Sequence, residues 1–358
     1  MTFEPYFPDH RHLLGITMVR RARMLPNAAT GDVEVARGAR VTQTDTVVQG
    51  AAPAPFKLID AARFFDVRPD KVEPLLRVGE GSSIEVGDIL AQRGRRRLLA
   101  PIDGTVIAVS RGQIVLQGIA EMVAIQAGLN GTVIDVQVGR GVMIEGYGGV
   151  VQGVWGNNRQ VIGGLRLEPS DGIESIQGGG LEADYRGALV VTRRTLRPLS
   201  LEVARDQEIV GIIAPSIAPS LRRAAEASPV AILLVEGFGT MRMSVPVMQF
   251  LETVAGRTAS LDAATPGALE SRRPELIVSV PFDPNDRPVL PNINLTLRPG
   301  AQVRLARGDS AGSMGVIVNL PKTPILMDNG LRVPCAQVEL ATGEKITAPL
   351  ANLEVTGA

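Results

Sequence analysis

The sequence has little of what metal centres, disulfides and common catalytic arrangements require. Cys335 is the single cysteine among 358 residues, so an intramolecular disulfide is excluded and a reducing compartment is the simplest expectation. The two histidines, His10 and His12, lie in an irregular lead-in segment with no thiol nearby. We therefore expect no metal site and no Ser-His-Asp or Cys-His catalytic arrangement.

An excess of one charge and long hydrophobic runs are also missing. Lys and Arg together number 37, as do Asp and Glu, so the chain has no global basic excess of the kind that nucleic-acid-binding proteins carry. No segment approaches the roughly 20 apolar residues that a membrane helix needs. We expect no membrane insertion and a cytoplasmic protein.

Glycine and proline, in contrast, are plentiful. The chain has 39 Gly and 25 Pro beside an apolar fraction of 45%, a combination that indicates a folded, turn-rich protein. Short Val- and Ile-rich runs between these residues are typical of β-structure. The predicted fold class is mainly β with an α/β insert.

One β pattern occurs more than once. Gly104-Thr-Val-Ile-Ala-Val is followed 27 residues later by Gly131-Thr-Val-Ile-Asp-Val, each with a glycine turn shortly afterwards. Residues 31–50 alternate valine with polar residues, which marks strands with one buried face. By contrast, apolar spacing over Lys57–Phe65 predicts a helix. Internal repetition of a β unit follows from these patterns.

After about Tyr185 the pattern changes. Apolar strands are expected at residues 187–192, 208–214 and 230–235, with helices at 200–207, 219–228 and 245–255. This alternation predicts a small parallel α/β unit. The expected domains are a β-rich region with repeats (13–180), the α/β unit (185–257), a β return segment with a Pro-rich linker (258–291), and a final β unit (295–358).

The stretch Glu80-Gly-x-x-Ile-x-x-Gly-Asp-x-Leu-Ala91, followed by Ala100-Pro-x-Asp-Gly-x-Val106, resembles lipoyl and biotinyl domains. The resemblance covers about forty residues and implies a barrel-sandwich hybrid fold. In that family a lysine at the intervening hairpin tip carries the cofactor. Here the turn, residues 92–99, has no lysine, and arginine cannot be acylated in its place. We therefore expect an unmodified scaffold with no lipoyl or biotin attachment and no other cofactor.

The C-terminal stretch Arg298–Val318 resembles a KOW motif in an SH3-like barrel, with an apolar strand, a glycine turn and a second strand. Such domains contact RNA, ribosomes or RNA polymerase. Its loop, Gly308–Gly312, is not basic, and aromatics for base stacking are absent. The whole combination resembles a bacterial multidomain family, a resemblance that brings no particular activity with it.

Two groups of residues are candidate binding sites. Val235-Glu-Gly-Phe-Gly-Thr240 follows a buried strand and precedes a helix, so its amides could hold an anion. The alternative is a tight turn in which glycine permits close packing. The candidate ligand residues are Glu236, Gly237, Gly239, Thr240 and Arg242. The crevice would be completed by the ends of the neighbouring strands, near Thr192 and Ser216.

The second candidate group is the basic turn of the lipoyl-like stretch. Its residues Arg93, Arg95, Arg96 and Arg97 could contact an acidic protein, nucleic acid or an anionic head group. The alternative is a solvated hairpin tip.

These patterns favour binding over catalysis. We expect a non-catalytic scaffold or adaptor that binds a protein partner or a larger assembly. The alternatives are an accessory subunit that binds a small anionic ligand in the α/β crevice, and an RNA- or ribosome-associated protein that acts through the KOW-like domain.

Overall fold

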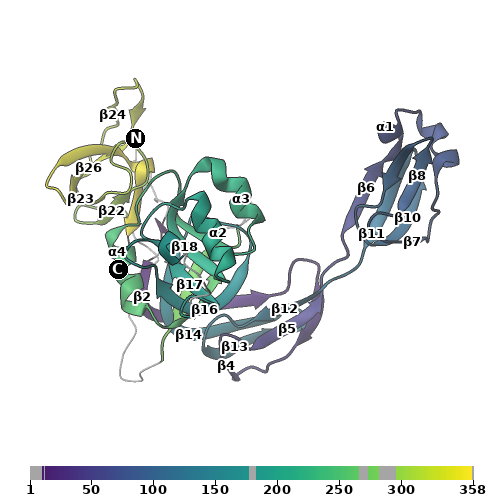
Figure 1. Cartoon of the computed structure of the whole chain (residues 1–358). Coiled ribbons are helices and arrows are strands. Elements are labelled where there is room, and N and C mark those ends of the chain that lie inside the picture. The colour runs from purple at the N-terminus through teal and green to yellow at the C-terminus, as the bar shows by residue number, and fades with distance from the viewer. Residues whose placement is uncertain (1–9, 12, 177–182, 266–272, 282–295, 357–358) are drawn as a thin grey trace.

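The computed structural model describes residues 10–11, 13–176, 183–265, 273–281 and 296–356. The protein is mainly β, as predicted, with one α/β unit (Figure 1). None of the helices among these residues is long and apolar enough to cross a bilayer.

One small β unit projects away from the rest of the molecule on two chain segments (Figure 1). This distal unit, residues 56–118, has its own core around the fully buried Phe65, Leu90, Ile114 and Leu116. Its elements are β6 (Phe56–Asp60), α1 (Ala61–Phe65), η1 (Pro69–Lys71), η2 (Glu73–Leu75), β7 (Ser83–Ile84), β8 (Ile89–Arg93), β9 (Arg96–Leu99), β10 (Gly104–Ser110) and β11 (Gln113–Gly118).

The helix expected over Lys57–Phe65 is only partly present. Residues 56–60 are strand β6, hydrogen-bonded along β11, and only Ala61–Phe65 are helical. The Asp60 carboxylate accepts a hydrogen bond from the Arg63 amide (2.9 Å) and so caps the helix start. Sheet pairing across distant residues overrides the local apolar spacing here.

A second β unit flanks the distal unit in sequence. This proximal unit comprises residues 13–51 and 122–152 and buries a separate apolar cluster that includes Val48, Val133 and Ile144. Its strands are β2 (Leu13–Met24), β3 (Thr30–Val33), β4 (Arg40–Val41), β5 (Thr46–Ala51), β12 (Met122–Gln126), β13 (Gly131–Gln137) and β14 (Gly141–Gln152).

The two β units have the same strand registers in their repeated segments. Gly104 pairs with Gly118 and Ile84, and at the matching positions Gly131 pairs with Gly146 and Val41. Each register then skips one residue, between Val106 and Ala108 in β10 and between Val133 and Asp135 in β13. The sequence repeat is therefore a structural repeat.

The repeat extends to the hairpin whose tip carries the arginines. β8 pairs with β9 through Ile89–Leu99 and then Ala91–Leu98, and β5 pairs with β12 through Thr46–Gln126 and then Val48–Ile125. Both registers thus skip one residue at the same place. In the distal unit this hairpin closes in a short turn, whereas in the proximal unit the whole distal unit occupies the place of that turn. One β unit is nested within the hairpin of another.

Nesting predicts that the distal unit is dispensable for folding of the rest. Ala51 and Met122 are a directly paired position of β5 and β12, so an Asn-Gly turn can replace residues 52–121. We expect the shortened chain to unfold cooperatively with the native fluorescence of Trp155. An aggregated chain, or one with solvent-exposed Trp155 emission, would contradict nesting.

The α/β unit is built on a sheet that continues directly from the proximal unit. β14 pairs with β13 in its first half and with β21 in its second half. The strand order is β15-β19-β18-β17-β16-β20-β21-β14-β13-β4, with β2 also on β14. The added strands are β15 (Trp155–Gly156), β16 (Gln160–Leu167), β17 (Ala188–Val191), β18 (Gly211–Ile217), β19 (Ala231–Phe238), β20 (Thr258–Asp262) and β21 (Glu275–Ser279).

Strands β16 to β19 are parallel, and helices cover both faces of this part of the sheet. Alternate residues of β17 and β19 enter two separate apolar clusters. One cluster contains residues of η3 (Ile173–Ile176), α2 (Pro198–Asp206) and α3 (Arg222–Ala227), which follows the short turn η4 (Pro219–Leu221). The other contains Leu251 and Val254 of α4 (Val245–Val254). The three helical segments expected in the α/β unit are therefore present.

The C-terminal unit is a separate small β structure with its own apolar cluster. Its lone thiol, Cys335, is buried, and burial raises its pKa while a backbone hydrogen bond from Ile325 opposes the shift. The elements are β22 (Gln302–Leu305), β23 (Met314–Asn319), β24 (Ile325–Leu326), β25 (Arg332–Val333), β26 (Cys335–Leu340), β27 (Lys345–Pro349), η5 (Leu350–Asn352) and β28 (Leu353–Thr356), with β1 (His10–Arg11) alongside β28.

Candidate functional site

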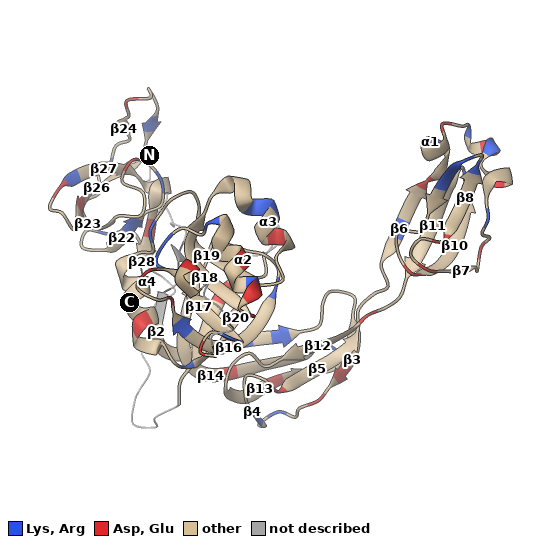
Figure 2. Ribbon diagram, viewed as in Figure 1, with Lys and Arg blue, Asp and Glu red and all other residues tan. Residues whose placement is uncertain are grey.

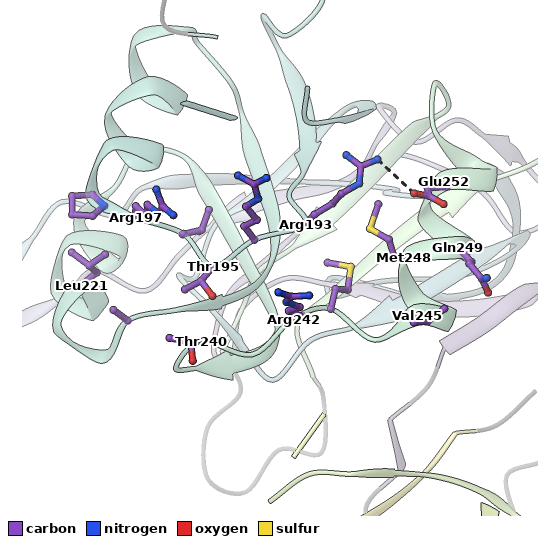
Figure 3. Close-up of a pocket in the computed structure, with 15 residues that line it drawn as sticks. Arg193, Thr195, Arg197, Leu221, Thr240, Arg242, Val245, Met248, Gln249 and Glu252 are labelled. Atoms are coloured by element: carbon purple, nitrogen blue, oxygen red, sulfur yellow. Dashed lines mark ion pairs between the residues drawn. The ribbon is translucent and has the colours of Figure 1, made fainter. Parts of the chain in front are cut away.

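A pocket of about 930 Å³ lies where the parallel strands β17, β18 and β19 end (Figure 3). Its walls come from the loop after β17, the loop after β18, and the segment between β19 and α4. In open parallel sheets ligands bind outside the carboxyl ends of the strands. The pocket therefore occupies the place where a binding site in this fold class is expected.

Three strand ends are joined by a chain of hydrogen bonds beneath the pocket. The hydroxyls of Thr195 and Ser216 lie 2.8 Å apart, and the Ser216 hydroxyl donates to the Met241 carbonyl (2.8 Å). The β18–β19 register shifts between Ala214 and Ser216, around Pro215, which has no amide to donate. This chain fixes the loops that carry the charged side chains of the pocket.

Arginines dominate the charge of the pocket. Arg193, Arg194, Arg197 and Arg242 line it, against one acid, Glu252. Arg193 is engaged with Glu252 (3.5 Å) and with the Glu168 carbonyl (3.3 Å). The other three side chains are exposed, and among the residues that the structure describes none of them has a hydrogen-bond or ion-pair partner. Three guanidinium groups are thus free to meet an anion.

A buried carboxyl positions Arg193, the arginine of the pocket that is already paired. Glu168, just after β16, accepts hydrogen bonds from the amides of Arg193 (2.6 Å) and Ile173 (3.1 Å). Burial raises the pKa of Glu168, while these amide hydrogen bonds and the Arg193 charge act in the opposite direction. The carboxyl thereby ties β16 to the arginine-bearing loop after β17.

Two helices begin at the pocket without an acid in their first turns. Pro198 of α2 and Val245 of α4 both line it, and both helices lack an acidic first-turn residue. Carboxylates from other segments nevertheless lie at both helix starts: Glu174 accepts a hydrogen bond from the Ser200 hydroxyl of α2 (2.7 Å), and Glu236 accepts one from the Ser244 amide just before α4 (3.2 Å). The positive charge of the pocket therefore comes from its arginines. Apart from Thr195, Thr240 and Gln249, the remaining lining is apolar, with Leu196 and Met243 buried. The pocket combines a cationic rim with an apolar floor.

The residues predicted around the β19 turn lie in different environments. Thr240 and Arg242 line the pocket (Figure 3). Gly237 and Gly239 have φ angles of 107° and 136°, so they form the backbone turn that leads to it. Glu236 instead forms a buried ion pair with Arg304 of the C-terminal unit and accepts a hydrogen bond from the Ser244 amide (3.2 Å).

Sequence reasoning missed Arg193, Arg194 and Arg197. Arg193 and Arg194 follow Thr192 directly, and Thr192 was already placed at the edge of the expected crevice. A search for cations within a few residues of each strand end would have found all three.

The predicted arginine turn lies at the far tip of the distal unit, away from the pocket (Figure 2). Arg93 donates to the Phe65 carbonyl (2.9 Å), and Arg96 donates to the Phe64 carbonyl (2.5 Å) and stacks over the Phe64 ring. These two residues satisfy carbonyls at the end of α1. Arg95 and Arg97 are exposed.

Across the described residues, no three His, Cys, Asp or Glu side chains gather as a metal site would require. No protein-family model and no curated protein sequence matches this chain.

Proposed function

We propose that this chain is a multidomain adaptor whose α/β unit binds a small anionic ligand. The observation that carries the proposal is that three arginines line one pocket at the carboxyl ends of parallel strands and have no side-chain partner among the described residues. Guanidinium groups bind phosphate and carboxylate through paired hydrogen bonds, and hydrogen bonds to charged groups are stronger than neutral ones. The volume of about 930 Å³ suits a small molecule.

Calorimetric titration with inorganic pyrophosphate tests this function. We expect Arg194→Ala and Arg242→Ala each to weaken binding by about tenfold or more, because each loses a charge-assisted hydrogen bond. Arg223→Ala is the matched control, because Arg223 is an exposed arginine on α3 outside the pocket. An absence of binding, or an equal loss in Arg223→Ala, would contradict the proposal.

A second candidate function is attachment of a protein partner through the distal unit. Phe56 and Leu58 of β6 are 65% and 59% exposed, and Arg95 and Arg97 are exposed at the tip. Exposed aromatic and arginine side chains are common in protein interfaces. Pull-down from the native host with and without the 52–121 deletion tests this function, and partners retained by the shortened chain would argue against it.

We also propose that the two β units are barrel-sandwich hybrids and that the C-terminal unit is an SH3-like barrel. The nested hairpins, with no lysine in the turn, support unmodified barrel-sandwich hybrids. The sheet order β28-β22-β23-β26-β27, with η5 directly before β28 in the chain, supports an SH3-like C-terminal barrel. An intact mass equal to the sequence mass would support the absence of a lipoyl or biotinyl arm.

A further inference from the structure

A second pocket, of about 1090 Å³, lies on the other side of the segment between β19 and α4. One wall is this segment, Thr240–Pro246, and the opposite wall is the outer face of the C-terminal unit at β23 and the end of β26. The pocket therefore exists only where the α/β unit and the C-terminal unit meet.

This second pocket is lined largely by apolar side chains that water can reach. Val245 is 64% exposed, and Val316 and Val318, on the outer face of β23, are 41% and 42% exposed. Met241 and Met314 extend the apolar lining. Covering such a surface with an apolar ligand is favourable, because it removes apolar area from water.

The two pockets share part of their lining. Thr240, Arg242, Met243 and Val245 line both of them. Arg242 thus stands between the cationic rim of the first pocket and the apolar wall of the second. A ligand whose charged group binds Arg242 reaches Val316 if its uncharged part crosses the segment Thr240–Pro246 into the second pocket.

We propose that the ligand is an anionic amphiphile: a phosphate or carboxylate head held by Arg194, Arg197 and Arg242, joined to an apolar chain that lies against Val245 and Val316. This inference rests on the anion-binding function proposed above and adds the chemical class of the ligand. Charge complementarity selects the head, and the exposed apolar side chains of the second pocket, among them Val245 and Val316, select the chain.

The C-terminal unit is then part of the binding site, since it supplies one wall of the chain-binding pocket. Its position is fixed close to that wall by Arg304 of β22, which pairs with Glu236 of β19 and Glu354 of β28. The side chains of these ion pairs are buried, whereas Val316 and Val318 on the outer face of β23 are exposed to a ligand.

Titration with ethyl, butyl, hexyl and octyl phosphate, each kept monomeric in solution, tests the inference. We expect affinity to rise by about two- to fourfold per added methylene once the chain passes Val245, as burial of methylene groups predicts. Val316→Ser should weaken octyl phosphate binding by about tenfold and leave ethyl phosphate unchanged. Val138→Ser is the control, because Val138 is 90% exposed in the proximal unit.

The outcomes separate the two proposals. Equal affinity along the series, with binding still dependent on Arg242, would overturn the amphiphile and retain the anion site. A rise with chain length that persists unchanged in Val316→Ser would overturn the placement of the chain in the second pocket. Failure of every phosphate to bind would overturn both.

Discussion

Arg304→Met should destabilise the protein by about 3–5 kcal/mol, the cost of leaving buried charges without their partner. The Arg304 side chain is 3% exposed and lies between Glu236, 0% exposed, and Glu354, 10% exposed. Its Nη1 donates to Glu354 Oε2 at 2.8 Å, and its Nη2 donates to Glu236 Oε2. Removing the guanidinium would take this cation away from two buried carboxylates at once.

Urea unfolding followed by Trp155 fluorescence measures this effect. Trp155 pairs with Leu234, two residues before Glu236, so it reports on the strand that carries the ion pair. Arg307→Met, at an exposed position of the same unit, should change stability by less than about 0.5 kcal/mol. If Arg304→Met unfolds at the same urea concentration as Arg307→Met, the ion pairs do not hold the two units together.

Phe65→Ala should destabilise the distal unit by about 3–5 kcal/mol and leave the α/β unit folded. Phe65 is 0% exposed and packs in a cluster formed only by distal-unit residues. Because the nested unit has its own core, loss of that core should not propagate through the two connecting segments. Hydrogen exchange should speed up across residues 56–118, while the amides of β17 to β19 keep their protection.

Phe64 provides the matched control for this substitution. Phe64 is 37% exposed, and its ring meets that of Phe65 edge-on, with ring centroids 4.9 Å apart. Phe64→Ala should therefore cost much less than Phe65→Ala, because more than a third of Phe64 already faces water whereas Phe65 is fully buried. Faster exchange in the α/β unit of the Phe65→Ala protein would show that the units unfold together.

The repeat was visible in the sequence because Gly-Thr-Val-Ile-x-Val places a glycine at the same demanding position twice. A Cβ on Gly104 would collide with the Gln117 carbonyl oxygen, and one on Gly131 with the Glu145 carbonyl oxygen. The nesting was not visible, because the Val133 amide donates its hydrogen bond to the Ala39 carbonyl, and the whole distal unit lies between these two residues in the sequence. Local patterns carry no information on which distant strands pair.

The same division applies to the candidate site. Thr240 and Arg242 could be placed in the crevice because they follow a buried parallel strand. Glu236 belongs to that strand's end as well, yet its partner Arg304 lies in another unit. The local sequence around a carboxylate does not distinguish one that faces a ligand from one that pairs with an arginine far along the chain.

The nested connection also gives the distal unit a mechanical character. The chain enters through residues 52–55 and leaves through 119–121, and these two segments are hydrogen-bonded from Ala52 N to Glu121 O (2.8 Å), while Gly118 N bonds to Pro55 O (2.7 Å) just above them. Two connecting segments that are hydrogen-bonded to each other resist twisting better than a single segment would. A sideways force on the tip of the projecting unit would therefore be carried by both connecting segments to β5 and β12 (Figure 1).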